Sequence, residues 1–247
     1  MAGGFRFVVT SLIVLLLSLN IYLNYEKILN LIPKDFSKDN FKLYYFKVNG
    51  RAAIIRALFS CSKVNFENNF IDKNLWPEQK KNATLFEFGQ VPILVHNDKI
   101  LSQSKAIYVY LASLFNLYGK TIDDRYQIDS LLSSSDDISR YSGPVFFPKN
   151  DEEKNNPEKY KEIFKKELKR FFGVYEQRYK KLGNGKYFLG DYFSLADIYL
   201  TINMNVLSRT VGGLQYIKES APKLAELIER VKNNELKEYF EKYYEKF

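Results

Sequence analysis

The two parts of this chain carry different hydrophobic patterns, and this difference constrains the fold more than any other feature. Short apolar runs typical of strands occur between residues 41 and 101, whereas from Thr121 onward apolar residues recur at helical spacing. Strands that are followed only by helices indicate two regions of different architecture rather than a repeated unit. With 247 residues, the chain is long enough for one large domain or two small ones.

The first region predicts a sheet of thioredoxin-like order. A short aromatic run, Phe-Lys-Leu-Tyr-Tyr-Phe at 41–46, ends before the turn residues Asn49 and Gly50, which is typical of a strand. A helix, a second strand, a hairpin and another helix are expected at residues 52–61, 64–71, 91–101 and 104–115. This order of elements, with short connections, predicts a thioredoxin-like α/β domain.

The second region predicts helices only. Ser194 and Asp197 are three residues apart before an apolar run, a spacing typical of the reciprocal caps at a helix start. Pro157 is well placed at the start of a long helix, whereas Gly143 and Pro144 are expected to break an earlier one. The expected helices include residues 123–140, 157–182, 221–232 and 235–244, with an acidic, amide-rich loop at 149–156.

The composition excludes several kinds of site. A single cysteine permits no internal disulfide, no thiolate zinc cluster and no Cys-x-x-Cys redox pair. His96 is the only histidine and has no carboxylate or thiol companions, so we expect no metal centre. The formal charge of +8 comes mostly from lysines scattered among acids on helix faces. This pattern indicates a solvated surface and no nucleic-acid groove.

The N-terminal segment differs in kind from the rest of the chain. The 19 residues from 7 to 25 carry no charge, and a bilayer core requires about 20 apolar residues. Because no small-residue cleavage site follows, we expect an uncleaved membrane anchor at 1–25 and a linker at 26–40, rather than a removed signal peptide or a buried helix. The lysines that follow the segment favour a cytosolic position for the remaining chain over the alternative, the lumen of the secretory pathway. Asn82 begins the sequon that would report a luminal position.

Several short motifs carry a family resemblance. They are Lys-Leu-Tyr-Tyr-Phe at 42–46 with Gly-Arg-Ala at 50–52, Trp76-x-x-x-Lys80, Phe-Gly-Gln-Val-Pro at 88–92, and Gln-Ser-x-Ala-Ile at 103–107 with Tyr-Leu-Ala at 110–112. In this order and spacing, the chain resembles the glutathione transferases of the sigma class, which includes the glutathione-dependent prostaglandin D synthase. The resemblance implies a thioredoxin-like α/β glutathione-binding domain at 41–117 and an all-α domain at 118–247, here preceded by the N-terminal hydrophobic helix.

The resemblance places the catalytic hydroxyl on Tyr45, at the end of the first strand. A protonated thiol is a poor nucleophile and its reference pKa is about 8.5, so a glutathione site must favour the thiolate. A phenol that donates a hydrogen bond to the sulfur lowers the pKa of the thiol. Arg51 would support the tyrosine electrostatically. The alternative is that Tyr45 is only a buried strand aromatic, as we expect for Tyr44 on the opposite face.

The resemblance also implies how the cysteinyl and γ-glutamyl parts of glutathione bind. Val91 and Pro92 would form a cis-proline turn whose backbone pairs with the cysteinyl residue as an added strand. Gln103 and Ser104, at the start of a helix, would hold the γ-glutamyl carboxylate. The alternative for this second pair is a simple helix cap.

The remaining binding residues implied by the resemblance lie further apart in the sequence. Trp76 and Lys80 would face the glycyl carboxylate, with Gln90 assisting; a packed tryptophan and a solvated lysine are the alternatives. One carboxylate of the pair Asp136 and Asp137 would reach the γ-glutamyl ammonium across the interface of a homodimer.

One departure from the class concerns the catalytic loop. Where the class commonly reads Arg-Gly-Arg-Ala-Glu, this chain reads Asn-Gly-Arg-Ala-Ala at 49–53, which leaves prostaglandin isomerisation open. We therefore expect a glutathione transferase that conjugates glutathione to hydrophobic electrophiles, and peroxidase or isomerase side activities are compatible with this chemistry. The alternative is a non-catalytic, membrane-tethered module that binds glutathione or hydrophobic ligands.

Overall fold

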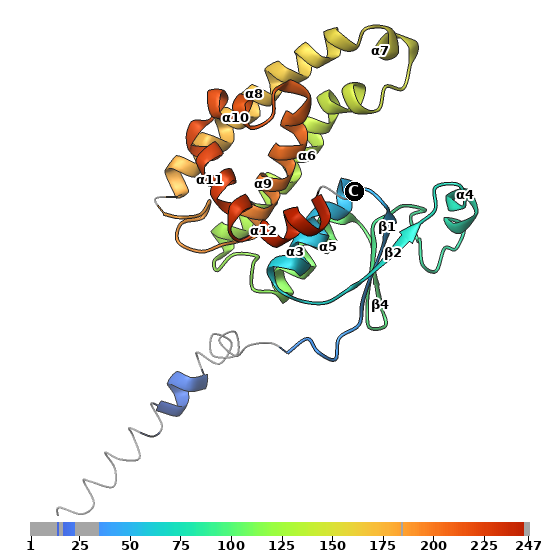
Figure 1. The fold of residues 1–247 in the computed structure, drawn as a ribbon. Coiled ribbons are helices and arrows are strands. Elements are labelled where there is room, and N and C mark those ends of the chain that lie inside the picture. The colour runs from blue at the N-terminus through green and yellow to red at the C-terminus, as the bar shows by residue number, and fades with distance from the viewer. Residues whose placement is uncertain (1–13, 15–16, 23–34, 184, 245–247) are drawn as a thin grey trace, which may run out of the picture. The chain divides into compact units, whose positions relative to one another are not determined.

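The computed structural model describes residues 14, 17–22, 35–183 and 185–244 (Figure 1). The chain divides into two compact units, Met1–Lys38 and Asp39–Phe247. In the first unit, Val14 and residues 17–22 are helical and exposed, while the rest of the predicted anchor and residues 26–34 of the predicted linker lie outside the described residues. Among the helices described, none has the length and apolar character needed to cross a membrane.

A four-stranded sheet opens the second unit. Its strands are β1 Phe41–Phe46, β2 Glu67–Ile71, β3 Ile93–His96 and β4 Lys99–Leu101, in the order β2-β1-β3-β4. β1 is parallel to β2, with Tyr45 opposite Phe70, and antiparallel to β3, with Leu43 opposite Leu94. The predicted hairpin is formed by β3 and β4. The thioredoxin-like order expected from the sequence is therefore confirmed.

Burial alternates along β1 because successive side chains of a strand point to opposite faces. On one face, Phe41 contacts Phe59 of helix α3, Ala53–Cys61. Helix α5, Ser104–Leu114, lies beside α3 (Figure 1). The 3-10 turn η1, Gly50–Ala52, leads into α3. On the other face, Tyr44 and Phe46 pack against the buried cluster formed by Ile71, Phe86 and Ile93. A short helix, α4 Trp76–Gln79, lies between β2 and β3 in the sequence.

Helices make up the rest of the second unit. The two longest, α6 Ile122–Phe146 and α8 Pro157–Leu182, pack against each other (Figure 1). The predicted caps of α9, Leu195–Ser208, are confirmed: the Ser194 hydroxyl accepts from the Ala196 N–H, and Asp197 accepts from the Ser194 N–H. The remaining elements are α7 Asp151–Asn155, η2 Arg209–Val211, α10 Leu214–Ser220, α11 Pro222–Asn233, α12 Lys237–Tyr239 and the π-helix η3 Phe240–Tyr244.

Two sequence predictions for the helical region were wrong. Helix α6 is not broken at Gly143 but continues through Pro144 to its end. A proline removes only one backbone donor, and the Phe147 N–H still bonds to the Gly143 carbonyl at 2.8 Å. The predicted loop at 149–156 contains α7, which begins because the Asn150 side chain accepts from the Glu153 N–H at 2.9 Å.

Candidate functional site

Tyr45 lies near the end of β1, and its side chain is only 9% exposed. Its hydroxyl oxygen accepts a hydrogen bond from the backbone N–H of Arg51 at 3.0 Å. Gly50 passes close to the same hydroxyl with a φ of +38°, in the left-handed region that favours glycine. Tyr44 points to the opposite face, where its ring lies 6.4 Å from that of Phe86. The strand therefore separates the two tyrosines and brings Tyr45 to the loop that contains Arg51.

A buried arginine holds the start of this loop. Arg56, on α3, donates hydrogen bonds to the carbonyl oxygens of Val48 at 2.7 Å and Phe46 at 3.5 Å, and to Asn68 Oδ1 at 3.3 Å. Burial lowers the pKa of the guanidinium to about 10, with neighbouring tyrosines acting in the opposite direction. Arg56 is not among the predicted site residues. The signal that could have identified it is a single charge inside the apolar run at 53–59.

Tyr108 holds the other end of the loop. Its hydroxyl donates to the carbonyl oxygen of Arg51 at 2.6 Å, and burial raises the pKa of this phenol. The backbone N–H of Arg51 is thus bonded to Tyr45 and its carbonyl to Tyr108, while its side chain is exposed. Tyr108 was also missed from the sequence, because a tyrosine on the buried stripe of α5 is indistinguishable there from a core residue.

Several predicted binding residues line one small hollow beside this loop. The Val91–Pro92 peptide bond is cis, as expected from the sequence. Gln103 precedes α5 with a φ of +67°, and both it and the first residue of the helix, Ser104, line the hollow. The hollow is lined by Arg51, Phe88, Gln90, Val91, Pro92, Ser102, Gln103 and Ser104. The fold therefore brings segments together that are about 50 residues apart in the sequence.

Trp76 and Lys80 do not line this hollow. The Trp76 ring packs edge-on against Phe46, with 5.7 Å between ring centroids, and against Phe86, at 5.1 Å. Lys80 is exposed at the end of α4, where its backbone N–H donates to the Trp76 carbonyl. The two residues lie together on one short helix, as their spacing predicts, and a ligand would have to extend from the hollow to reach them.

The adjacent acids Asp136 and Asp137 lie on α6 but face different partners. The Asp136 carboxylate lies 2.7 Å from Lys105 Nζ, so it is next to the start of α5. Asp137 lies 3.8 Å from Arg140 and lines a separate groove of about 360 Å³ between α6 and α8. Both side chains are exposed, and Asp136 is the one that pairs with α5 of the same chain.

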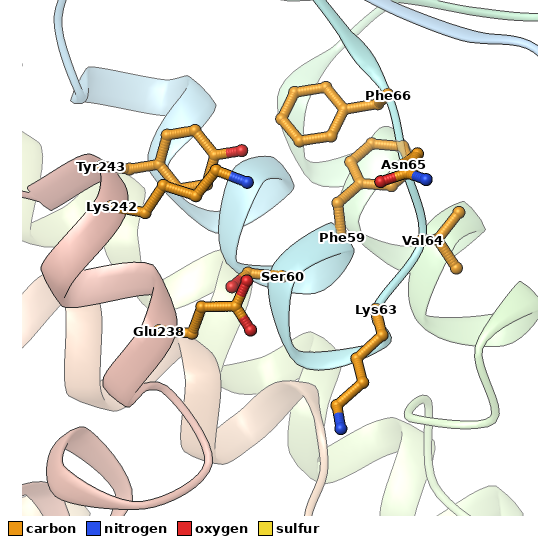
Figure 2. A pocket seen from close by; sticks show the side chains of 9 residues that line it. All are labelled: Phe59, Ser60, Lys63, Val64, Asn65, Phe66, Glu238, Lys242 and Tyr243. Atoms are coloured by element: carbon orange, nitrogen blue, oxygen red, sulfur yellow. The ribbon is translucent and has the colours of Figure 1, made fainter.

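A larger cavity, of about 400 Å³, lies at the opposite end of α3 (Figure 2). Aromatic side chains from α3 and from the C-terminal helices form its walls, with Phe66 stacked on Phe59 at 4.5 Å. It contains none of the predicted site residues. The lining residues are Phe59, Ser60, Lys63, Val64, Asn65, Phe66, Glu238, Lys242 and Tyr243.

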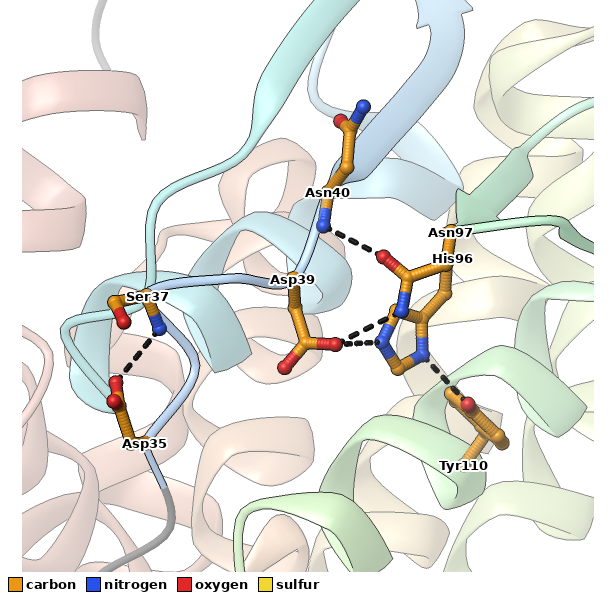
Figure 3. Close-up of polar contacts among 7 residues, drawn as sticks. All are labelled: Asp35, Ser37, Asp39, Asn40, His96, Asn97 and Tyr110. Carbon is orange, nitrogen blue, oxygen red and sulfur yellow. Dashed lines mark hydrogen bonds and ion pairs between the residues drawn. The ribbon is translucent and has the colours of Figure 1, made fainter.

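His96 lies at the end of β3 and, contrary to the expectation from the sequence, has a carboxylate companion, Asp39, in a structural role (Figure 3). Its Nε2 lies 3.0 Å from Asp39 and its Nδ1 lies 2.7 Å from the Tyr110 hydroxyl, while its ring stacks on Phe41. Hydrogen bonds from Asn97 and from His96 lower the pKa of Asp39. These contacts hold the start of β1 against β3. Within the part of the chain that the structure describes, no group of three or more potential metal ligands is found.

Comparison with known proteins identifies the class that this fold and site define. The family model for the N-terminal domain of glutathione S-transferases matches residues 41–113, and the model for the C-terminal domain matches residues 136–243. A sigma-class enzyme from Fasciola hepatica superposes with a TM-score of 0.72 at 28% identity, covering 84% of this chain and 98% of that one.

Two curated relatives specify the family. Mouse glutathione S-transferase A4 is 35% identical over 162 residues, which cover 64% of this chain and 70% of the relative. Mouse hematopoietic prostaglandin D synthase is 30% identical over 193 residues, which cover 78% of this chain and 90% of the relative. The chain belongs to the glutathione S-transferase family and is an enzyme of that family.

Proposed function

We propose that this enzyme activates the thiol of glutathione through the hydroxyl of Tyr45 and transfers the sulfur to a hydrophobic electrophile. The single observation that carries this proposal is the hydrogen bond from the Arg51 N–H to the Tyr45 hydroxyl oxygen. A backbone N–H can only donate, so this contact leaves the phenolic proton to be donated toward a ligand sulfur. A donor aimed at the sulfur favours the thiolate and lowers the pKa of the thiol.

The reaction then proceeds as a nucleophilic displacement or addition. The thiol loses its proton to solvent, the thiolate attacks an electrophilic carbon to form a carbon–sulfur bond, and any leaving group departs with its electron pair. The exposed Arg51 side chain adds a positive charge at the rim of the hollow, where it would stabilise the anionic sulfur. A peroxidase or isomerase side activity would use the same thiolate.

The hollow beside Tyr45 supports a binding mode for the tripeptide. The backbone of Val91 would pair with the cysteinyl residue, and Gln103 with Ser104 would hold the γ-glutamyl carboxylate at the start of α5. Gln90 would assist from the same hollow. From this position the glycyl end would extend toward Trp76 and Lys80 on α4.

We also infer a homodimer in which an acid of α6 approaches the γ-glutamyl ammonium of the neighbouring subunit. The exposed position of Asp136 and Asp137 supports this inference. Light scattering coupled to size-exclusion chromatography tests it directly. A mass near twice 29.0 kDa is expected, and a monomeric mass at working concentration would contradict the shared site.

We infer membrane attachment from the uncharged run at residues 7–25, with the enzyme domain on the cytosolic side. Sodium carbonate extraction of membranes that carry the full chain should leave it in the pellet. Glycosidase treatment should not change its mass, since the Asn82 sequon is not glycosylated in the cytosol. Release by carbonate would contradict the anchor, and a glycosidase-sensitive mass would place the domain in the lumen.

A conjugation assay tests the proposed activity. Purified full-length protein is incubated with glutathione and a chlorinated dinitrobenzene, and formation of the thioether is followed by absorbance. Turnover that saturates with glutathione supports the proposal. Retention on immobilised glutathione without turnover of this or several other electrophiles would instead support the non-catalytic binding alternative.

A further inference from the structure

Asn49 connects the catalytic loop to the C-terminal helices. Its Nδ2 donates to the backbone carbonyl oxygens of Tyr244 at 3.0 Å and Tyr243 at 3.5 Å, while its Oδ1 accepts from the Tyr239 hydroxyl at 3.2 Å. These three partners belong to α12 and the π-helix η3, about 190 residues away in the sequence. One amide side chain therefore bonds both to a tyrosine side chain and to the backbone of the C-terminal helices.

The partners of Asn49 are themselves fixed. Tyr239 is fully buried, and the Arg209 guanidinium lies 4.4 Å from the centre of the Tyr244 ring. The last carbonyl groups of a helix have no partner within the helix and attract hydrogen-bond donors. The Asn49 amide supplies such a donor, and its oxygen acts as an acceptor at the same time. Asn49 is thus bonded to buried residues of the C-terminal helices.

Asn49 also lies two residues before Arg51, whose backbone N–H contacts the proposed catalytic tyrosine, Tyr45. Gly50 and then Arg51 follow it, and the Arg51 N–H donates to the Tyr45 hydroxyl at 3.0 Å. On the preceding side, the carbonyl oxygen of Val48 is held by Arg56 at 2.7 Å. The loop between β1 and α3 is therefore fixed on both sides of Gly50. This matters because a glycine backbone can adopt more conformations than that of any other residue type.

We propose that Asn49 is a positioning residue for catalysis: by holding the loop on the C-terminal helices, it keeps the Arg51 N–H directed at the Tyr45 hydroxyl. This inference rests on the proposed role of Tyr45. When the Arg51 N–H occupies one side of the phenolic oxygen, the phenolic proton points toward the thiol, and an accepted hydrogen bond strengthens the donated one. Loss of the Asn49 bonds allows the loop to shift, and the thiolate then loses part of its stabilisation.

The test is a double-mutant cycle in the full-length protein, with Asn49→Ala and Tyr45→Phe alone and combined. Two quantities are measured: kcat/KM for conjugation, and the pKa of bound glutathione from the ultraviolet absorbance of the thiolate. Asn49→Ala should lower kcat/KM about fivefold to tenfold, as expected for loss of an orienting hydrogen bond, and should raise the pKa of the bound thiol. The KM for glutathione should change less than about twofold, since Asn49 does not line the glutathione hollow.

The combined variant separates positioning from general structural damage. If Asn49 acts through Tyr45, then Asn49→Ala has no further effect in the Tyr45→Phe background, because coupled residues are not additive. The matched control is Asn234→Ala, which removes a similar bond from an asparagine amide to a helix carbonyl, that of Arg230 at 2.7 Å, and should leave both quantities unchanged.

Asn49→Asp provides a second variant if Asn49→Ala does not fold at the assay temperature. It keeps the size of the side chain but replaces the donor that faces the two carbonyl oxygens with an acceptor, so it should lower kcat/KM at least as much. Unchanged thiol pKa and kcat/KM in both folded variants would overturn the proposal, and so would fully additive losses in the cycle. If the unmodified protein itself neither conjugates nor ionises glutathione, the proposed function fails, which is a distinguishable result.

Discussion

Gly50 lies directly against the hydroxyl of Tyr45. A Cβ atom added to Gly50 would lie 2.5 Å from the phenolic oxygen and 3.2 Å from a carbon of the ring. Real Cβ atoms do not approach an oxygen so closely, so any side chain at this position must displace either the tyrosine or the loop. The glycine therefore serves the geometry of the Tyr45 hydroxyl and does more than provide flexibility.

Gly50→Ala should impair both stability and activity. We expect the free energy of unfolding to fall by about 1–3 kcal/mol, from the positive φ and the overpacking together. Conjugation should fall more than tenfold, as is typical when a general acid or base is misplaced. Urea unfolding and steady-state kinetics measure the two effects.

The control for Gly50→Ala is Gly190→Ala. Gly190 also has a positive φ, of +106°, but an added Cβ atom would have nothing within 4 Å. This variant should lose stability through backbone strain alone and keep its kcat/KM. Equal losses of activity in the two variants would show that the contact with Tyr45 is not responsible.

Tyr45→Phe should reduce conjugation at least about tenfold and raise the pKa of bound glutathione toward its value in free solution. The substitution removes only one oxygen atom, so affinity for glutathione should change little. Tyr44→Phe is the matched control, because Tyr44 points to the apolar cluster around Phe86 on the opposite face. A fully active Tyr45→Phe variant would rule out the phenol as the source of activation.

The sequence predicted the elements around this tyrosine because their local signals agree with their environment. The alternation of burial along β1 follows from the strand period, and the caps of α9 follow from Ser194 and Asp197 alone. It also predicted most of the residues that line the hollow beside Tyr45, because the motifs that carry the resemblance lie at the ends of strands and at helix starts, which the fold brings together. That glutathione binds in this hollow stays a prediction.

Other features depend on contacts that no local pattern records. The role of Arg56 follows from the carbonyl groups that it meets across the turn, and that of Asn49 from helices about 190 residues away. The local sequence predicts a helix break at Pro144 because it does not show which residues pack against the helix. In the structure, packing of α6 against α8 outweighs one missing hydrogen bond.

The different surroundings of Asp136 and Asp137 lead to a prediction about glutathione affinity. The Asp136 side chain is 76% exposed and that of Asp137 is 59% exposed, so Asp136 is the better placed to meet the γ-glutamyl ammonium of the neighbouring subunit. Asp136→Asn should therefore raise the KM for glutathione about threefold to tenfold with little change in kcat. Asp137→Asn removes the same charge from the adjacent residue, which lines the groove between α6 and α8. It should have the smaller effect on KM. The opposite ranking would assign the γ-glutamyl contact to Asp137.

The buried carboxyl group of Asp197 should make stability depend on pH. Its Oδ1 accepts from the Phe188 N–H at 2.7 Å, and its Oδ2 accepts from the N–H and hydroxyl of Ser194. Burial nevertheless raises the pKa of Asp197 to about 6, with these hydrogen bonds acting in the opposite direction. In the unfolded chain the pKa of an aspartate is about 3.9.

The sign of the effect follows from proton binding. Between about pH 4 and pH 6 the folded protein holds a proton that the unfolded chain has lost, so this group stabilises the fold most at low pH and its contribution is lost as the pH rises through about 6. The slope of the free energy of unfolding against pH is at most about 1.4 kcal/mol per pH unit.

Asp197→Asn should be less stable at every pH, because its amide donor faces other donors, and it should lack this slope. Denaturant unfolding of both proteins across this range measures the difference in their free energies of unfolding, which should shrink as the pH rises and level off above about pH 7. A difference that grows with pH would mean that the hydrogen bonds outweigh burial and that the folded protein lowers the pKa of Asp197.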